Sequence, residues 1–357
     1  MKRYGNLYEQ ICSMENIIEA HNNAKKGKMH YQEVQKVEAS RDRYLQQLRT
    51  QLLTKTFKTS KYHIFTKTDS GKPRTIYRLP YFPDRIVHHC IMQVLEPIWV
   101  KTFITDTYSS IKGRGIHKGV KRIKRALLDI ENTKYCLKMD IRKFYPSINH
   151  DILKALIRKK IKDKDVLSLL DEIIDSAEGV PIGNYLSQYF GNLYLTYLDH
   201  WLKETKQCRY AFRYCDDICL LHSSKEHLSE LKHEIAEYLA TNLKLTLKSN
   251  WQIFPVDARG IDFLGYRFFH GYTLLRKSIA IKFKQRIRYI KTHWPYLSSS
   301  QILNSVMSYY GWLGHADCNN LIKKYINQDI YSIFNKVCKK EGVSNPLGGN
   351  KKSQTPD

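Results

Sequence analysis

The stretch Phe212-Arg213-Tyr214-Cys215-Asp216-Asp217-Ile218-Cys219-Leu220-Leu221 sets two adjacent carboxylates between two short apolar runs that are rich in strand-forming residues. Such a pattern predicts a β-hairpin, because aspartate tolerates the backbone angles of a tight turn. The two acids are then expected at the rim of a sheet. Adjacent carboxylates repel each other, and a divalent cation such as Mg²⁺ relieves that repulsion. An ordinary solvated Asp-Asp turn is the alternative interpretation.

A third acid occupies a matching position earlier in the chain. The run Tyr135-Cys136-Leu137-Lys138-Met139-Asp140-Ile141 alternates as a strand does and ends on Asp140. Acids at the ends of separate strands are able to converge on one rim and hold two cations. The sequence therefore predicts a site made of Asp140, Asp216 and Asp217.

The composition indicates a folded protein with a polyanionic partner. The chain has 357 residues, enough for two or three domains, and 42% of them are hydrophobic. Lys and Arg number 59 against 34 Asp and Glu, which leaves a formal net charge of +25. Neutralisation of phosphates explains this excess, since it drives nucleic-acid binding through counterion release. A basic protein of the membrane surface is the rival interpretation.

Targeting and redox features are few. No apolar run reaches the roughly 18 residues of a spanning helix, and no apolar signal core follows the first residues, so we expect a cytoplasmic protein without a membrane partner. The eight cysteines are scattered without a Cys-x-x-Cys pair, which favours core thiols over zinc or disulfide use.

Several further segments are basic or carry informative glycines. Residues 64–78 read as a hairpin around an Asp-Ser-Gly turn, with Lys67, Lys72 and Arg74 placed to hold a triphosphate. Residues 277–337 read as basic helices suited to clamp a duplex by its phosphates. Residues 261–268 read as a strand interrupted by Gly265, a position where another backbone, here a nucleic acid, is expected to approach closely.

In this order the segments resemble those of reverse transcriptases. Five blocks of the family are matched over roughly residues 60 to 270: the basic hairpin, the Asp140 strand, the Gly-x-x-x-Ser loop and helix at 183–187, the Tyr-x-Asp-Asp hairpin and the Phe-Leu-Gly-Tyr strand. The resemblance implies an α+β right-hand polymerase fold of fingers, palm and thumb, with an antiparallel palm sheet and a helical thumb. The expected divisions are an N-terminal helical extension (1–55), fingers and palm (56–270), a basic thumb (271–340) and a disordered tail (341–357).

The resemblance also assigns roles to residues. It implies two Mg²⁺ ions held by Asp140, Asp216, Asp217 and the carbonyl of Ile141, with the three acids catalytic. Tyr145 matches the aromatic gate against a ribose 2′-hydroxyl. The implied nucleotide-binding residues are Lys67, Arg74, Tyr145, Ile182, Gly183 and Gln188. The implied primer- and template-binding residues are Gly265, Tyr266, Lys282, Lys284, Arg286 and Arg288.

Two departures from the family pattern refine the resemblance. Most reverse transcriptases have Gln and Pro where this chain has Ile182 and Gln188, and that substitution resembles the reverse transcriptases of diversity-generating retroelements. This subfamily implies a bacterial or phage enzyme that copies a template-repeat RNA with errors at adenines. Many relatives also place a Lys near Trp251, so a Lys general acid there is in doubt, with Lys248 as a stand-in.

The implied partners are a structured template RNA, the RNA/cDNA hybrid, dNTPs and a basic accessory variability protein. Two alternatives remain open. A retron or defence-associated reverse transcriptase is one, and Ile182 with Gln188 argues against it. A non-catalytic RNA-binding scaffold is the other, and the presence of all three acids argues against that.

Overall fold

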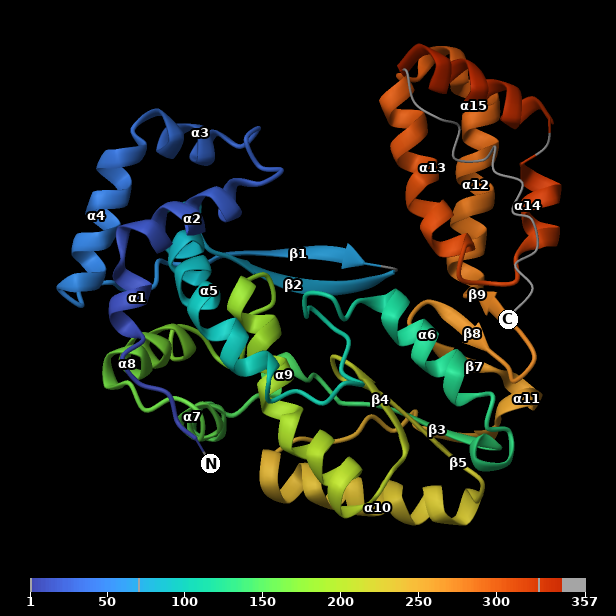
Figure 1. The fold of residues 1–357 in the computed structure, drawn as a ribbon, viewed down its shortest axis with the longest axis horizontal. Coiled ribbons are helices and arrows are strands. Elements are labelled where there is room, and N and C mark those ends of the chain that lie inside the picture. The colour runs from blue at the N-terminus through green and yellow to red at the C-terminus, as the bar shows by residue number, and fades with distance from the viewer. Residues whose placement is uncertain (1, 70, 327, 342–357) are drawn as a thin grey trace. The chain divides into compact units, whose positions relative to one another are not determined.

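The computed structural model describes residues 2–69, 71–326 and 328–341 (Figure 1). The chain forms two compact units. One joins the residues up to Gly115 to Leu137–Ile253, and the other joins Ile116–Cys136 to the residues from Phe254 onward. The tail at 342–357, for which we expect disorder, and Ser70 of the expected turn lie outside the described residues. Within those residues no helix is long and apolar enough to cross a membrane.

The first unit begins with a group of helices whose apolar periodicity is visible in the sequence. Ile11, Ile17, Leu45 and Leu48 are all buried, as their helical spacing predicts. Helix α2 packs against α5, which follows later in the chain (Figure 1). The helices are α1 (Tyr8–Cys12), α2 (Met14–Lys25), α3 (Gln32–Ala39), α4 (Arg41–Leu53) and α5 (Ile86–Val100).

In the chain, a two-stranded antiparallel hairpin follows α4 and precedes α5. Its strands are β1 (His63–Asp69) and β2 (Lys72–Arg78), which confirms the hairpin predicted for this basic segment. Its side chains are mostly exposed, in keeping with a polar, cation-rich sequence.

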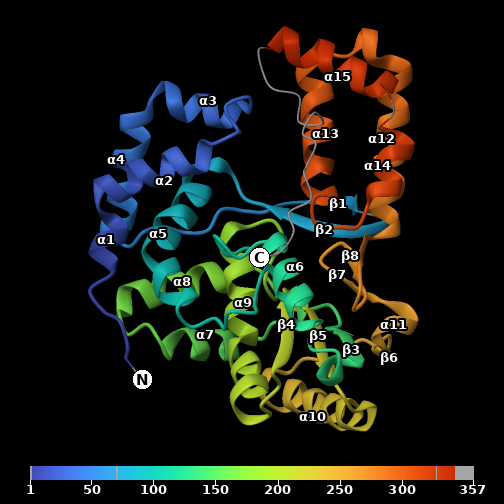
Figure 2. The same cartoon turned by 45° about the vertical axis from the view of Figure 1, so that its right-hand side comes forward.

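A four-stranded sheet of order β4-β5-β3-β6 carries the predicted acids. Helix α10 contacts β5, and both views place it along the sheet (Figure 1 and Figure 2). Residues 218–221 of β5 are all buried, because both faces of this strand are covered. The strands are β3 (Tyr135–Asp140), β4 (Tyr210–Tyr214), β5 (Asp217–His222) and β6 (Gln252–Pro255). The helices of this region are α7 (His150–Arg158), α8 (Lys164–Ile174), α9 (Tyr185–His200) and α10 (Lys225–Leu243).

The second unit contains a small sheet and a set of helices. Its strands are β7 (Ile261–Phe263), β8 (Tyr266–Phe268) and β9 (Thr273–Leu275), paired in that order. Its main helices are α6 (Ile116–Ala126), α12 (Lys277–His293), α13 (Ser299–Leu313), α14 (Asn319–Tyr325) and α15 (Gln328–Glu341). Phe283 and Ile287 of α12 are buried among these helices.

One expectation about this unit is wrong. Residues 261–268 do not form one interrupted strand, since β7 and β8 are antiparallel partners around Leu264 and Gly265. Both turn residues have positive φ, 53° and 84°, which is the geometry of a two-residue hairpin turn that glycine favours. The glycine therefore reverses the chain instead of interrupting a strand.

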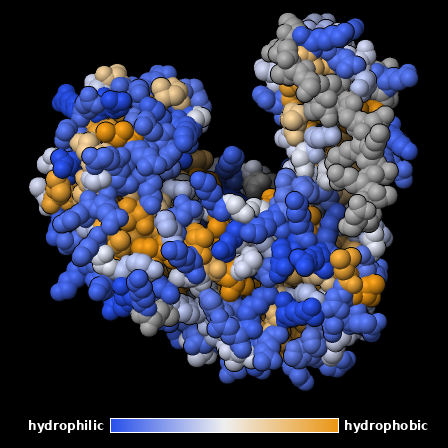
Figure 3. Space-filling model, in the orientation of Figure 1, coloured by the Kyte–Doolittle hydropathy of each residue, from blue (hydrophilic) through white to orange (hydrophobic). Residues whose placement is uncertain are grey.

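The combination of helices with antiparallel sheets confirms the predicted α+β class. The eight cysteines are free thiols. Figure 3 shows that hydrophilic side chains cover most of the face in view, with apolar side chains in smaller patches.

Candidate active site

The Asp-Asp pair lies at the tip of the β4–β5 hairpin, as predicted. Tyr214 pairs with Asp217, which leaves Cys215 and Asp216 as the two residues of the turn. Cys215 has φ of 59°, a left-handed conformation that few residues other than glycine adopt. The backbone at this tip is therefore held in a geometry that local propensity does not favour.

Asp140 and Asp216 are brought together from separate parts of the chain. Asp140 ends β3, the neighbour of β5 in the sheet. Burial raises the pKa of Asp216, and the negative charge of Asp140 raises it further. The two carboxylates thus share a partly desolvated rim where their ionised forms repel.

The oxygens of Asp140 are unequally satisfied. Its Oδ2 accepts a hydrogen bond from Nζ of Lys248 at 2.6 Å. Its Oδ1 is buried and has no hydrogen-bond partner in the described part of the chain. A buried carboxylate oxygen without a partner is costly, and it leaves a ligand position for a cation.

Asp217 is engaged differently from the other two acids. Its carboxylate forms an ion pair with Lys138 of β3. Among the residues that the structure describes, no group of three or more His, Cys, Asp or Glu side chains is arranged to hold a metal ion. The structure therefore brings together two of the three predicted acids and neutralises the third with a lysine that the sequence analysis missed.

The pair of acids fits a divalent cation. The unpartnered Oδ1 of Asp140 and the raised pKa of Asp216 both mark negative charge that lacks compensation. Hard carboxylate oxygens are the ligands that Mg²⁺ prefers. Ile141, the predicted carbonyl ligand, follows Asp140 directly and forms an isolated bridge with Leu247.

Lys248 lies at the acids, where the sequence suggested a stand-in for the family's lysine. Besides its side-chain contact, its backbone N–H donates to the carbonyl of Asp140 at 2.8 Å. Two bonds between the same two residues fix the segment after α10 against the end of β3.

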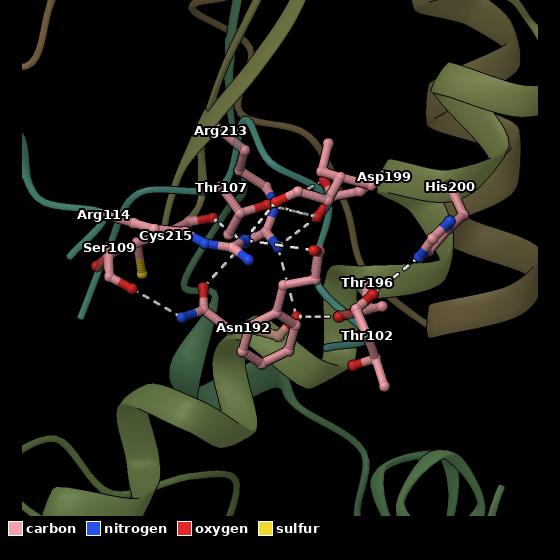
Figure 4. A network of polar contacts seen from close by, with 12 residues as sticks. Thr102, Thr107, Ser109, Arg114, Asn192, Thr196, Asp199, His200, Arg213 and Cys215 are labelled. Atoms are coloured by element: carbon pink, nitrogen blue, oxygen red, sulfur yellow. Dashed lines mark hydrogen bonds and ion pairs between the residues drawn. The ribbon is translucent and has the colours of Figure 1, made fainter. Parts of the chain in front are cut away.

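A buried polar network contacts the turn of the β4–β5 hairpin (Figure 4). Arg213, only 2% exposed, donates from Nε and Nη2 to the carboxylate of Asp199 at 2.7 and 2.5 Å. Its Nη1 donates to the carbonyl of Cys215 at 2.9 Å. Thr107 and Asn192 complete the network, with Thr107 donating to Asp199 at 3.1 Å. The sequence patterns considered above do not predict this network, although an arginine within an apolar strand is a signal for a buried partner.

The predicted triphosphate cations lie side by side. Lys67 of β1 is directly opposite Arg74 of β2, and both are exposed. Residues opposite each other in an antiparallel pair present their side chains on one face of the hairpin.

Tyr145, the predicted ribose gate, contacts the turn that carries the acids. Its hydroxyl lies 3.2 Å from Sγ of Cys215, two residues from Asp217. Burial, together with the nearby Cys215, raises the pKa of Tyr145, so its hydroxyl stays protonated. A side chain at Gly191 would meet the ring of Tyr145 at 3.2 Å, so this glycine makes room for it.

The loop before α9 docks on the basic hairpin. The carbonyl of Ile182 accepts a hydrogen bond from the N–H of Tyr77 in β2 at 2.8 Å. Gly183 has φ of 128°, and a Cβ there would lie 2.5 Å from the carbonyl oxygen of Tyr77. Ile182 is half-buried, whereas Gln188 is exposed in the first turns of α9.

Gly265 and Tyr266, the predicted primer-gripping residues, pack against a helix of their own unit. A Cβ at Gly265 would lie 2.4 Å from the ring of Trp312 in α13. Tyr266 is buried and its hydroxyl donates to the carbonyl of Trp312 at 3.0 Å. The close approach expected at Gly265 is therefore made by an indole ring of the same unit.

The four predicted cations of α12 do not share one face. Lys284 and Arg288 lie near the ring of Tyr325, at 5.6 and 5.7 Å from its centroid. Arg286 instead contacts Ser305 of α13, and Lys282 is exposed. Residues four apart in a helix are neighbours, so the pair 282 and 286 lies away from the pair 284 and 288.

Comparison with known proteins places this chain. The family of reverse transcriptases (RNA-dependent DNA polymerases) matches residues 65–268. Protein YkfC of Escherichia coli is 24% identical to this chain where the two align, and the match covers 57% of this chain and 65% of YkfC. The group II intron-encoded protein LtrA of Lactococcus lactis is 26% identical where it aligns, and the match covers 39% of this chain and 24% of LtrA.

The chain thus spans less than two thirds of these curated relatives. Among solved structures, a telomerase from Candida albicans in complex with a fragment of telomeric RNA matches with a TM-score of 0.49 and 12% identity, over 83% of this chain and 63% of the telomerase. The family match covers more than half of the chain and includes the strand and hairpin that carry the acids. This chain belongs to the reverse transcriptase family.

Proposed function

We propose that the chain is an RNA-directed DNA polymerase, which adds nucleotides from dNTPs to a primer paired with an RNA template. The observation that carries the proposal is the meeting of Asp140 and Asp216 at one rim of the sheet, with an unpartnered oxygen on Asp140. Membership of the reverse transcriptase family supports the same reaction.

In this proposal Asp140 and Asp216 are the principal ligands of two Mg²⁺ ions, and the Ile141 carbonyl and Asp217 complete the set. Divalent ions held by these residues would supply a Lewis acid for the primer 3′-hydroxyl and a counter-charge for the departing pyrophosphate. Lys248 and Lys138 hold the acids in place and moderate their mutual repulsion. Asp217 adds its carboxylate to the metal ligands and keeps its ion pair with Lys138.

Other residues bind the substrates. Lys67 and Arg74, adjacent on the hairpin, grip the triphosphate, Arg74 by a bidentate contact and Lys67 as a point charge. Tyr145 limits the space beside the ribose, and Ile182, Gly183 and Gln188 line the nascent base pair. Gly265 and Tyr266 pack on Trp312 and thereby position the β7–β8 hairpin that supports the primer strand. The cations of α12 bind the template RNA and the RNA/cDNA hybrid through phosphates.

Within the family, we propose the reverse transcriptase of a diversity-generating retroelement, which copies a template-repeat RNA with errors at adenines. Ile182 and Gln188 support this subfamily, because they replace the Gln and Pro of most relatives. A basic accessory variability protein is the partner that this proposal adds.

The test is extension of a DNA primer annealed to a defined RNA, with purified wild-type protein and Asp216→Asn in parallel. We expect Mg²⁺-dependent cDNA from the wild type alone. Sequencing of that cDNA then tests the subfamily, since errors concentrated opposite adenines support it and evenly spread errors contradict it. RNA binding without any extension by the wild type would instead identify a scaffold.

A further inference from the structure

A concave site of about 550 Å³ lies on the first unit between α10 and the segment after it. This size falls within the roughly 300–1,000 Å³ typical of ligand sites. Lys232 and Ala236 of α10 form one wall, and Lys248 with Trp251 forms the other. Arg142 adds a third cation to Lys232 and Lys248, and none of the described residues that line the site is acidic. We call this site the Trp251 groove.

The cations of the Trp251 groove are poorly compensated. Arg142 is exposed, and in the described part of the chain its side chain has no hydrogen-bond or ion-pair partner. Among the residues that the structure describes, Lys232 contacts the ring of Trp251 and the neighbouring His233 but no carboxylate. Lys248 is paired with an acid, Asp140. The groove therefore presents net positive charge to an anionic ligand.

Trp251 gives the groove a second means of recognition. Its side chain is half-buried, and Nζ of Lys232 lies over its ring at 4.4 Å from the centroid. A long lysine side chain over an indole is easily displaced by a flat ring, since exposed cation–π contacts are weak. An aromatic platform flanked by cations is the arrangement with which proteins bind single-stranded nucleic acid.

The groove is continuous with the acids. The N–H of Arg142 donates to the carbonyl of Thr246 at 2.8 Å, and Arg142 lies two residues after Asp140. A strand in the groove would thus pass close to the end of β3. A-form duplexes keep their bases stacked inside, so only an unpaired segment is able to offer a base to Trp251.

We propose that the Trp251 groove binds a single-stranded segment of RNA, with one base stacked on Trp251 and its flanking phosphates between Arg142 and Lys232. This inference rests on the proposed function, and it adds a contact to unpaired RNA outside the acids, the basic hairpin and the α12 cations. An acidic protein partner is the competing occupant, and it makes no use of the indole plane.

Photocrosslinking tests the contact directly. The probe is a short oligouridylate that contains 4-thiouridine, irradiated with the full-length protein and mapped by peptide mass spectrometry. We expect a crosslink in the peptide that contains Trp251. Trp251→Ala and Lys232→Ala should reduce its yield at least about fivefold, because stacking and adjacent charge both contribute to single-strand affinity. Trp251→Phe keeps an aromatic platform and should retain the crosslink.

Lys206→Ala is the matched control. Lys206 lies over the ring of Trp201 at 5.3 Å from the centroid, as Lys232 lies over Trp251, but it pairs with Glu234 outside the groove. Its substitution should leave the crosslink unchanged. If Trp251→Ala fails to fold by circular dichroism, Lys232→Ala and Trp251→Phe decide the question.

The outcomes separate this inference from the proposed function. Wild-type protein that extends an annealed primer, yet crosslinks equally with and without Trp251 and Lys232, overturns the groove alone. Displacement of the oligouridylate by polyglutamate as readily as by unlabelled oligouridylate also overturns it and indicates an acidic protein partner. Failure of primer extension, with the crosslink intact, overturns only the proposed polymerase activity.

Discussion

Arg213 and Asp199 form a buried ion pair. Arg213 is separated by one residue from Cys215, the first residue of the turn that presents the acids. The guanidinium donates to both carboxylate oxygens, at 2.7 and 2.5 Å, and its remaining nitrogen donates to the carbonyl of Cys215 at 2.9 Å (Figure 4). Cys215 has an unfavourable positive φ. The pair therefore stabilises the backbone geometry that places Asp216 beside Asp140.

Asp199→Asn is expected to destabilise the protein strongly. The substitution leaves the Arg213 charge buried without a counter-charge, which typically lowers the free energy of unfolding by about 3–5 kcal/mol. Urea unfolding followed by circular dichroism measures the change. Glu234→Gln is the control, because it breaks the partly exposed pair with Lys206 and should cost only about 1 kcal/mol. Equal effects of the two substitutions would contradict a central role for the Arg213–Asp199 pair.

The two adjacent acids are expected to differ in function. Asp216→Asn removes a carboxylate that faces Asp140 and should lower the single-turnover rate of primer extension at least about 100-fold, the effect of losing roughly 3 kcal/mol of transition-state stabilisation. Asp217→Asn removes a carboxylate already neutralised by Lys138, so we expect a smaller loss.

RNA binding at matched protein concentration is the control for both variants and should stay unchanged. Near-wild-type extension by Asp216→Asn would refute the assignment of the acids. A larger loss for Asp217→Asn than for Asp216→Asn would show that the Lys138 pair opens in the working enzyme.

Stability without divalent ions should depend on pH through Asp216. Its folded-state pKa is raised above the ordinary value of 3.8, first by burial and then by Asp140. Protonated Asp216 therefore contributes to the free energy of unfolding. This contribution is complete below the pKa of Asp216 in the unfolded chain, and it is lost as the pH rises through the pKa of Asp216 in the folded protein. In EDTA, the free energy of unfolding of the wild type relative to Asp216→Asn should fall as the pH increases from about 4 to about 8.

Mg²⁺ provides the internal control for this pH dependence. Addition of Mg²⁺ at neutral pH should stabilise the wild type more than Asp216→Asn, because a ligand that binds only the folded state shifts unfolding. A pH-independent difference between the two proteins in EDTA would mean that Asp216 does not titrate beside Asp140.

The sequence predicted which acids form the site better than it predicted which residues pair with them. The strand ending on Asp140 and the hairpin tip at Asp216 follow from alternation and turn residues, which are local signals. The pairing of Asp217 with Lys138 and of Arg213 with Asp199 joins residues far apart in the chain. Such pairs depend on strand order and burial, which no local pattern encodes. Gly265 was misinterpreted for the same reason, since the partner that requires it, Trp312, lies in a later helix.

Gly265→Ala is expected to be strongly destabilising. The residue has φ of 84°, and an added Cβ would lie 2.4 Å from the Trp312 ring, so strain of about 1–3 kcal/mol is joined by a steric clash. Thermal unfolding measures the effect. Gly271→Ala is the matched control, because nothing lies within 4 Å of a Cβ there. Similar melting temperatures for the two variants would argue against the packing of Trp312 on Gly265.

The last prediction concerns fidelity and Ile182. This half-buried side chain belongs to the loop that docks on β2 through the bond from the Tyr77 N–H to the Ile182 carbonyl. That bond uses only backbone atoms, so a different side chain at 182 leaves the loop in place. Isoleucine has neither donor nor acceptor in its side chain, whereas the glutamine of most relatives has both.

Ile182→Gln is therefore expected to lower misincorporation, most clearly opposite template adenines, with a smaller effect on total synthesis. One hydrogen bond to a well-positioned group changes the free-energy difference between right and wrong nucleotides by about 1 kcal/mol, or roughly fivefold in error frequency. Sequencing of cDNA made on one RNA template measures it. Ile182→Leu is the control, because it changes shape without adding a polar group and should leave the errors at adenines unchanged. If Ile182→Gln and Ile182→Leu give the same error frequency at adenines as the wild type, the side chain at position 182 does not set that frequency.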